Sequence, residues 1–210
     1  MIPVKVLAVR YLSNASPALC DALGAPRDCP SLAMVTTDSD DATYIALDEA
    51  TKAAPVTVCY ARSFYAGAAN ASTPNAGEVI GILAGPTPDD VRSGMEAALS
   101  ALERIGFSET EGVPYLAHTV SATGSFLARE AGVPQGTALA YLIAPPLEAM
   151  YAMDAALKAA DVGLQKLYVP PSETNFGGGL LSGTQSACEA ACAAFAQAVG
   201  QVARCPMERR

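Results

Sequence analysis

The stretch DSDDATYIALDEATKAAPVTVCYARSFYAGA, residues 38–68, contains the unit from which the whole chain is built. It opens with aspartates and continues into a helix predicted over residues 43–54, which Pro55 ends because proline cannot continue a helical pattern. A strand rich in β-branched and aromatic residues is predicted at 56–60, and a loop with two aromatic residues follows it. The stretch therefore predicts a helix, a strand and a loop in succession, with carboxylates at the start of the helix.

The helix of this stretch recurs 106 positions later in the chain. The segment LDEATKAAPV at 47–56 aligns without a gap with MDAALKAADV at 153–162, and six of the ten positions are identical. Each half of the chain is predicted to run strand, helix, strand, helix, strand, loop, strand, helix, which favours an α/β (α+β) sandwich with helices packed on one sheet per half. We therefore predict two tandem domains, residues 1–106 and residues 107–210.

The composition argues against several classes of function. The formal net charge of −8 and the sequence pI of about 4.6 argue against nucleic acid as a partner, because Lys and Arg must neutralise phosphates. The chain has no apolar run of about 18 residues or more, so no membrane span is expected. Its first residues lack the pattern of a signal peptide, which predicts a cytoplasmic protein. Only 16% of residues are charged and the mean hydropathy is +0.25, so we expect subunit contacts to bury apolar surface.

The reactive residue types form no recognisable catalytic or metal-binding motif. The six cysteines include no Cys-x-x-Cys pair, and Cys188 and Cys192, which share one helix face, are expected to be small core residues rather than metal ligands. His118, the only histidine, lies on a predicted strand and is expected to be structural. Neither a phosphate-binding glycine loop nor a nucleophile motif occurs, so we expect no enzyme activity, no metal and no cofactor.

Two charged pairs recur with the repeated helix. Asp48 with Lys52, and Asp154 with Lys158, are spaced i, i+4, which places the two members of each pair on one helix face. The sequence leaves two positions open for these pairs: they are exposed to solvent, or they lie at the edges of subunits or larger assemblies.

Two long loops occupy equivalent positions in the two halves, at residues 62–76 and 170–179. Loops of this length are uncommon in compact domains and are usually functional or disordered. The first loop carries Phe64 and Tyr65 among small residues, and the second carries Phe176 beside three consecutive glycines, which are candidates for a hinge. Taken alone, the loops are equally well interpreted as mobile surface segments whose aromatic residues are buried.

Motifs in both halves carry a resemblance to a known family. They are DSDDATYIALDEATK (38–52), YARSFYAGAA (60–69), AGEVIGILAGP (76–86), YLIAPPLEAMYAMDAALKAADV (141–162) and PPSETNFGGGLLSGTQSACEAACAAF (170–195). Through these motifs the chain resembles the ethanolamine-utilisation shell proteins of bacterial microcompartments over nearly its whole length. The segment through Pro30 and the linker between the halves are the looser parts of the match.

The resemblance implies an architecture and a set of partners. Such proteins carry two circularly permuted BMC-type domains in one chain, and three chains form a pseudohexameric tile that packs edge to edge with other shell proteins. The resemblance places the chain in the microcompartment shell, where small metabolites such as ethanolamine pass through pores. It also implies a central pore that two long loops from each subunit open or close, and smaller pores off the threefold axis that bind or pass ethanolamine and related metabolites.

The same resemblance assigns two sets of functional residues. The pore-gating loops would comprise Arg62, Ser63, Phe64, Tyr65, Ala66 and Gly67 in the first half, and Ser172, Glu173, Thr174, Asn175, Phe176, Gly177 and Gly178 in the second. Ethanolamine would bind Asp40, Glu78 and the backbone near Phe107. An ammonium group offers three donors and one positive charge, which suit two carboxylates and a carbonyl oxygen. Taken alone, the residues favour helix capping by Asp40 and a solvated Glu78.

Two alternatives from other classes remain open beside the shell protein. A soluble regulatory protein of doubled α/β fold that binds a small ligand would explain the acidic stretch and the loops without any larger assembly. An enzyme could use Asp40, Asp41 and Glu78 as acid–base groups, although no nucleophile or metal motif accompanies them.

Overall fold

The structure is a computed structural model that describes residues 1–64, 77–170 and 175–207. The chain divides into two compact units. The N-terminal unit comprises residues 3–106 with 124–127, and the C-terminal unit comprises residues 1–2, 107–123 and 128–210. Each unit therefore includes a short segment from the other half of the sequence.

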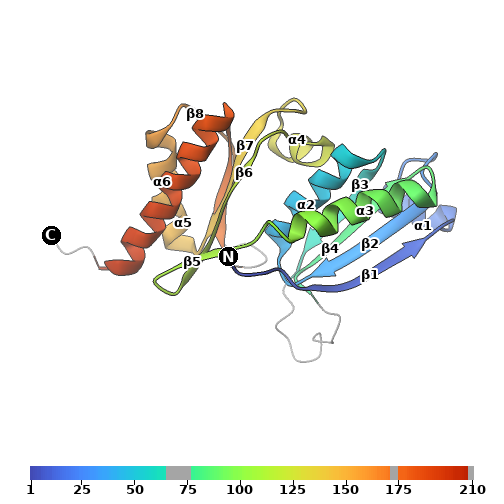
Figure 1. Cartoon of the computed structure of the whole chain (residues 1–210), viewed down its shortest axis with the longest axis horizontal. Coiled ribbons are helices and arrows are strands. Elements are labelled where there is room, and N and C mark those ends of the chain that lie inside the picture. Colours follow the sequence, from blue (N-terminus) through green and yellow to red (C-terminus); the bar gives the residue numbers. More distant parts are fainter. Residues whose placement is uncertain (65–76, 171–174, 208–210) are drawn as a thin grey trace. The chain divides into compact units, whose positions relative to one another are not determined.

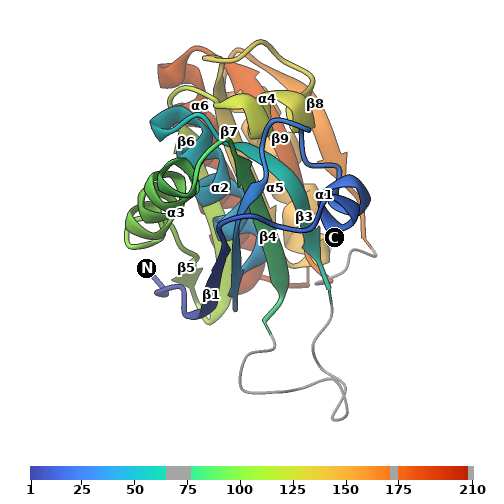
Figure 2. The ribbon, with the colours of Figure 1, turned by 90° about the vertical axis from the view of Figure 1, so that its right-hand side faces the viewer.

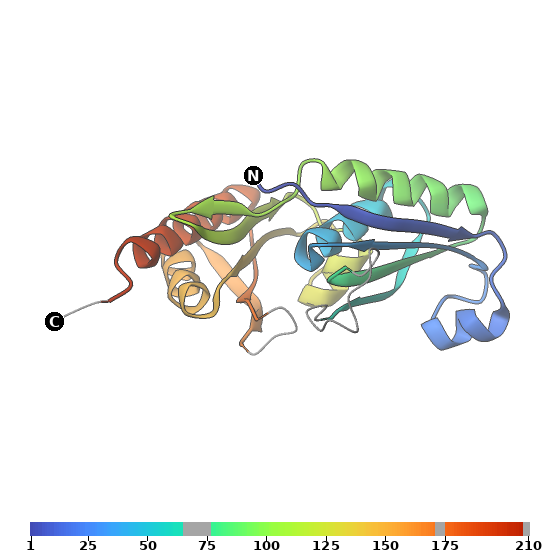
Figure 3. The ribbon, with the colours of Figure 1, turned by 90° about the horizontal axis from the view of Figure 1, so that it is seen from below.

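The N-terminal unit is a four-stranded antiparallel sheet with helices on it (Figure 1). Its elements are β1 (Val6–Leu12), α1 (Pro17–Leu23), β2 (Ser31–Thr37), α2 (Asp40–Ala53), β3 (Thr57–Ser63), β4 (Val79–Gly85) and α3 (Pro88–Leu102). The strand order is β1-β2-β4-β3. Helices α2 and α3 pack beside each other (Figure 2), whereas α1 lies on the other side of the strands from α3 (Figure 3).

The alternation of side chains along the central strands separates these two faces. Successive side chains of a strand point to opposite sides, so a strand covered on both sides is apolar almost throughout. Leu32 of β2 and Ala84 of β4 pack in a cluster with Cys20 of α1. On the other face, Leu47 of α2 packs against Gly81 of β4 so closely that a Cβ there would lie 2.5 Å from the leucine. The unit is therefore held by small residues and close packing on both faces.

Local sequence sets where the helices begin and end. At the start of α3, Thr87 accepts the N–H of Asp90, and Asp90 Oδ2 accepts the N–H of Thr87 at 3.1 Å. This capping box, with Pro88 at the first helical position, is the helix start that the sequence predicts. Gly24 ends α1 in the left-handed conformation, with φ of +70°, which glycine adopts at little cost.

The C-terminal unit is a five-stranded sheet of order β5-β6-β7-β9-β8. Its elements are β5 (Ser108–Thr110), β6 (Val113–Val120), α4 (Ser125–Ala131, of which residues 128–131 belong to this unit), β7 (Ala138–Ala144), α5 (Pro146–Ala159), β8 (Val162–Tyr168), β9 (Gly177–Gly183) and α6 (Gln185–Arg204). The core lies between the sheet and the α5–α6 pair, and Phe195 of α6 is fully buried in it. Among the described residues, no helix has the length and apolar character needed to cross a membrane.

The four strands of the N-terminal sheet correspond to four of the five strands of the C-terminal sheet. The order β1-β2-β4-β3 of one unit matches the order β6-β7-β9-β8 of the other, and every pairing is antiparallel. The register even shifts at the same place, between Val58 and Tyr60 in β3 and between Leu164 and Lys166 in β8. The doubled α/β fold predicted from the repeated helix is therefore confirmed.

The helix ends define which residues of the two units are equivalent. Helices α2 and α5 both stop at an alanine with φ of −146°, Ala54 and Ala160, so residues 106 apart correspond in these helices. Helices α1 and α4 are both followed by a left-handed glycine, Gly24 with φ of +70° and Gly132 with φ of +68°, so residues 108 apart correspond there.

Candidate functional site

An acidic cluster lies where β2 leads into α2. Asp38 follows the last residue of β2, and Asp40 and Asp41 form the first turn of α2, where the helix dipole favours negative charge. Both carboxylates of this first turn are buried, and Asp40 Oδ1 accepts the N–H of Asp41 at 2.9 Å. Asp38 Oδ1 accepts the N–H of Lys5 at 2.8 Å, which ties the turn to the segment before β1.

Hydroxyl groups fix the backbone of this turn. Thr37 Oγ1 donates to the Ser39 carbonyl at 2.9 Å and accepts the Ser39 N–H at 3.1 Å. Thr43 Oγ1 donates to the same carbonyl at 2.7 Å. The Ser39 hydroxyl itself is buried and, among the described residues, has no hydrogen-bond partner. The turn that carries the acidic cluster is therefore held by the backbone of Ser39 rather than by its side chain.

Backbone hydrogen bonds at the start of β4 bring Glu78 to this cluster. Its N–H donates to the Thr37 carbonyl at 2.8 Å, and its carbonyl accepts the N–H of Phe64 at 3.0 Å. Gly77 makes the approach possible, because a Cβ at this position would lie 2.1 Å from the Thr37 carbonyl oxygen. Glu78 is therefore joined through its backbone both to the acidic turn and to the start of the first long loop.

The carboxylates of the cluster repel one another. Glu78 is exposed to solvent, and partial burial of its carboxylate raises its pKa above the ordinary value, while the negative charges of Asp40 and then Asp38 raise it further. A cation bound beside Glu78 would offset this repulsion and favour the ionised carboxylate. The structure thus places the two predicted carboxylate ligands in one cluster whose charge suits a small amine, and their role as ligands stays a prediction.

Phe107, the third predicted ligand residue, belongs to the C-terminal unit. Its carbonyl oxygen accepts the N–H of Ile2 at 2.6 Å. Its ring lies 5.8 Å from the ring of Phe176, measured between centroids, in a tilted arrangement that favours attraction between aromatic rings. Within this unit, a predicted ligand residue is therefore in contact with a predicted gating residue.

The first predicted gating loop begins later than expected. Arg62 and Ser63 are the last residues of β3, so their placement in the loop is wrong. The strand reaches this far because β4 pairs with it down to Val79. Phe64, half-exposed, is the first residue beyond the strand. Three further residues of this set lie outside the described residues: Tyr65, Ala66 and Gly67.

The second predicted gating loop ends earlier than expected. Gly177 and Gly178 are the first residues of β9, so their placement in the loop is wrong. The physical reason is close packing: Gly178 has φ of +149°, and a Cβ there would lie 1.9 Å from the Leu142 carbonyl oxygen. Asn175, with φ of +62°, and Phe176 directly precede the strand. The other predicted gating residues lie outside the described residues: Ser172, Glu173 and Thr174.

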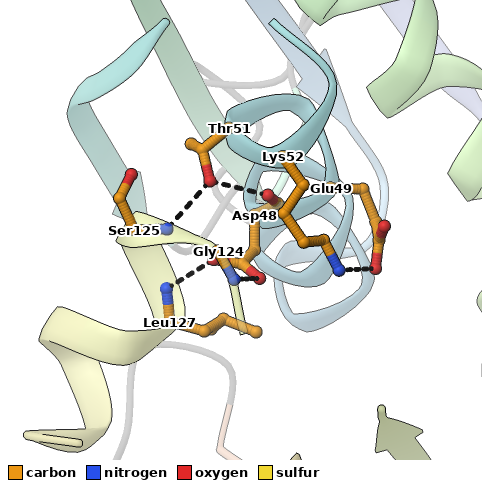
Figure 4. Close-up of polar contacts among 7 residues, drawn as sticks. All are labelled: Asp48, Glu49, Thr51, Lys52, Gly124, Ser125 and Leu127. Atoms are coloured by element: carbon orange, nitrogen blue, oxygen red, sulfur yellow. Dashed lines mark hydrogen bonds and ion pairs between the residues drawn. The ribbon is translucent and has the colours of Figure 1, made fainter. Parts of the chain in front are cut away.

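Asp48 makes a contact that the sequence did not reveal (Figure 4). This residue of α2 is fully buried, and its carboxylate accepts the N–H of Gly124 at 2.7 Å and of Leu127 at 2.8 Å. Thr51, one turn further along α2, accepts the N–H of Ser125 at 3.0 Å. Side chains of α2 therefore cap the first turn of α4, where backbone N–H groups lack partners within the helix.

The surroundings of Asp48 place it in neither of the two positions that the sequence left open. Burial raises the pKa of Asp48, whereas the hydrogen bonds from Gly124 and Leu127 and the charge of Lys52 lower it. Lys52 Nζ forms its short ion pair with Glu49, at 2.6 Å. Asp48 is thus neither solvent-exposed nor simply paired with its helical neighbour. The one feature of the sequence that could have indicated this contact is Gly124, a glycine directly before a short helix.

The two cysteines and the histidine considered from the sequence lie in regular elements of the C-terminal unit. Cys188 and Cys192 are buried in α6, and burial raises the pKa of the Cys192 thiol to about 11, so it is neutral near pH 7. Their predicted place in the core is confirmed. His118 lies on β6 opposite Tyr141, on a strand as predicted. Among the described residues, no group of three or more His, Cys, Asp or Glu side chains could hold a metal ion.

Comparisons with known proteins find close relatives over the full length of the chain. The BMC domain family matches residues 31–114. The bacterial microcompartment shell protein EutL of Clostridium perfringens is 57% identical over 99% of this chain and 97% of its own length. EutL of Salmonella typhimurium is 47% identical over 100% and 97%. The crystal structure of ethanolamine utilization protein EutL from Leptotrichia buccalis, 56% identical, superposes with a TM-score of 0.95 over 99% of this chain and 98% of that one.

Proposed function

This chain belongs to the EutL family of bacterial microcompartment shell proteins, and we propose that three copies form a pseudohexameric tile with a loop-gated central pore and with small pores that bind or pass ethanolamine and related metabolites. Membership of the family makes the chain a structural shell protein and not an enzyme. The enzyme and the small-ligand-binding regulator are therefore not retained as alternatives.

The observation that carries the tile is the correspondence between the two units. They share strand order, antiparallel pairing and the position of a register shift. Three chains would therefore supply six similar units, enough for a closed ring with near-sixfold symmetry. We assign the two BMC-type domains of each chain to residues 1–106 and 107–210. The outer edges of such a ring would bind neighbouring tiles and other shell proteins.

We place the gate of the pore in the two loops that connect equivalent strands. One loop joins β3 to β4 and starts with Phe64, and the other joins β8 to β9 and ends with Phe176. Aromatic rings repeated around a threefold axis can fill an aperture, and small polar residues between strands allow more than one backbone path. Tyr65, Ala66 and Gly67 of the first loop and Ser172, Glu173, Thr174 and Asn175 of the second remain part of this proposal.

We place the ammonium group of ethanolamine beside Asp40 and Glu78. Charge-assisted hydrogen bonds from an amine to carboxylates are among the stronger hydrogen bonds in proteins. Partial burial and then the charges of Asp40 and Asp38 raise the pKa of Glu78, and this cation would offset the charge repulsion. The Glu78 carbonyl accepts the N–H of Phe64, so a ligand held by Glu78 would act on the first residue of the gate. The backbone of Phe107 remains the predicted third partner through the family resemblance.

Titration calorimetry with ethanolamine tests this assignment. The double variant Asp40→Asn, Glu78→Gln keeps the size of both side chains and removes both charges, so we expect it to lose measurable binding. A matched control, Asp89→Asn with Glu103→Gln, removes two exposed carboxylates of α3 and its C-cap and should bind like the parent. Unchanged affinity in the first variant would move the site away from the acidic cluster.

A further inference from the structure

Three cysteines gather on the face of the N-terminal sheet that α1 covers. Cys20 of α1 and Cys29, which lies between α1 and β2, are buried in one hydrophobic cluster. Cys59 of β3 packs against the same cluster and is partly buried. All three thiols are free. Because Cys20 and Cys59 are 39 positions apart in the sequence, it is the fold that brings them together.

Cys20 is the side chain through which α1 meets the sheet. It is the one buried residue of this seven-residue helix, and its carbonyl accepts the N–H of Ala25 at 2.9 Å, just beyond the helix end. Gly24, which ends α1, lies against β3: a Cβ there would be 4.0 Å from the Cys59 carbonyl oxygen, an ordinary van der Waals distance. The end of the helix therefore holds Cys20, one turn earlier, near Cys59.

Cys59 lies where β3 departs from regular pairing. The register of β3 with β4 shifts between Val58 and Tyr60, so Cys59 has no Cα partner across the pair. Its Sγ donates a weak hydrogen bond to the Ile82 carbonyl oxygen at 3.5 Å. A bulge on an edge strand such as β3 changes the direction of a side chain, and here the thiol packs against the cluster under α1.

The packing of this fold does not require these two thiols. In both units the residue after the helix-ending glycine donates its N–H to a helix carbonyl, that of Cys20 or that of Ala128, so these two residues correspond. Gln165 lies at the register shift of β8, as Cys59 does at that of β3. An alanine and a glutamine therefore fill the same two places in the repeated fold, and the thiols of the N-terminal unit add reactivity to it.

We propose that Cys20 and Cys59 form an intramolecular disulfide when the protein meets hydrogen peroxide, and that this bond ties α1 to β3. Cys59 is the most exposed of the three thiols and reacts first: its sulfur takes one oxygen from the peroxide as a sulfenic acid, and one water leaves. The Cys20 sulfur then attacks that of Cys59, and the hydroxyl leaves with the Cys20 proton as a second water. Two thiols thus lose two electrons and two protons, which reduce one peroxide to two waters.

The surroundings of the thiols set the rate and the choice of partner. Burial, and then the nearby thiols of Cys20 and Cys29, raise the pKa of Cys59 to about 11, so little thiolate exists near pH 7 and the bond forms slowly. Once formed, the bond resists exchange, because a thiol of high pKa is a poor leaving group. Burial and the charge of Asp28 raise the pKa of Cys29, which disfavours its thiolate and leaves Cys20 as the partner.

Peptide mapping after treatment with hydrogen peroxide tests this bond. The full chain carries Cys205→Ser, because the exposed thiol of Cys205 could bond between chains. Digestion without reductant should yield a linked pair of peptides that contain Cys20 and Cys59 and are together lighter by two hydrogen atoms. The melting temperature should rise by about 5–10 °C, since the bond closes a loop of about 40 residues in the unfolded chain. Dithiothreitol should reverse the rise.

Two further variants, made in the Cys205→Ser protein, assign the effect to this pair. Cys20→Ala introduces the residue that the C-terminal unit carries at the equivalent position, so it should fold but form no bond and gain no melting temperature. Cys29→Ala removes a thiol of the same cluster and should still form the bond.

The mapping gives a result on the Cys205→Ser protein itself, whether or not the other variants fold. A bond from Cys59 to Cys29 in place of Cys20 would overturn the assigned pair. Oxidation of Cys59 to a sulfinic acid without any bond would overturn the site. So would an unreacted Cys59 under conditions that oxidise Cys205 in the unaltered chain. None of these results bears on the trimeric tile.

Discussion

Asp48 Oδ2 accepts the N–H of Gly124 at 2.7 Å, across 76 positions of sequence. A side chain of α2 thereby accepts a backbone N–H group at the start of α4. Most helices instead use a Ser, Thr, Asp or Asn at their own N-cap for this purpose. Gly124 allows the approach, because a Cβ there would lie 2.9 Å from the other carboxylate oxygen and closer still to the α2 backbone. The bond holds a segment of the second half of the chain in the N-terminal unit.

Asp48→Asn should destabilise the protein. The N–H groups of Gly124 and Leu127 each need an acceptor, and the carboxylate of Asp48 supplies two oxygens. The amide of asparagine supplies one oxygen and one NH2 group, so one buried N–H would face another donor. We expect a loss of about 2–4 kcal/mol, or roughly 5–15 °C in melting temperature. Thermal unfolding followed by circular dichroism measures it. Glu49→Gln, at the partly exposed neighbouring position, should change stability by less than about 0.5 kcal/mol. Equal effects of the two substitutions would show that Asp48 has no special role.

Gly178→Ala should be far more damaging than Gly136→Ala. Both glycines have positive φ, so both substitutions strain the backbone. A Cβ at position 178 also meets the Leu142 carbonyl oxygen at 1.9 Å, whereas nothing lies within 4 Å of one at 136. We expect about 1 kcal/mol at 136 and more than about 3 kcal/mol, or insoluble protein, at 178. If the two variants are equally stable, Gly178 is a flexible loop residue and not a closely packed residue of β9.

Glu78→Gln should raise stability in a pH-dependent way when no ligand is bound. The pKa of Glu78 is raised in the folded state, so the folded chain holds this proton more tightly than the unfolded chain does. The parent therefore loses stability as pH rises from about the ordinary value of 4.5 to the raised pKa. The melting temperature of the variant should exceed that of the parent by about 1–2 °C at pH 8, with little difference at pH 4.

The control for this pH series is Glu103→Gln, an exposed glutamate at the C-cap of α3. The difference in melting temperature between Glu103→Gln and the parent should not vary with pH. A gain for Glu78→Gln that is the same at pH 4 and pH 8 would mean that ionisation of Glu78 carries no cost in the folded state.

Removing aromatic side chains from the gate should raise permeation. In assembled shells that enclose an enzyme acting on ethanolamine, Phe64→Ala with Tyr65→Ala and Phe176→Ala should increase the rate at limiting substrate several-fold. Assembly should be unaffected, because none of these changes touches the strand pairs of either sheet. Tyr11→Ala, an exposed aromatic residue on β1, is the matched control. An unchanged rate would remove these residues from the gate.

The sequence predicted the order of helices and strands, apart from the short strand β5 in the expected linker, because its signals are local. Proline and glycine mark the helix ends, and the repeat of the α2 sequence in α5 indicated two similar units. Loop boundaries were less predictable, since Arg62 and Gly177 belong to strands only because their neighbours pair with them. A strand boundary depends on partners that are distant in the sequence, which local propensity does not contain.

The candidate site was only partly predictable for the same reason. The sequence indicated Asp40 and Glu78 through a family resemblance, and the cluster they form depends on the backbone pairing of Glu78 with Thr37. The burial of Asp48 and the exposure of Asp154 could not be distinguished, because the two residues stand in nearly the same helical sequence. What separates them is the segment that packs on one helix and not on the other, a tertiary property.

The central claim is the trimeric tile, and electron microscopy of concentrated protein after a light-scattering measurement of mass tests it most directly. We predict a species of three times 21.5 kDa that forms hexagonally packed sheets. A monomer or dimer that never forms such sheets, at any concentration, would contradict the account.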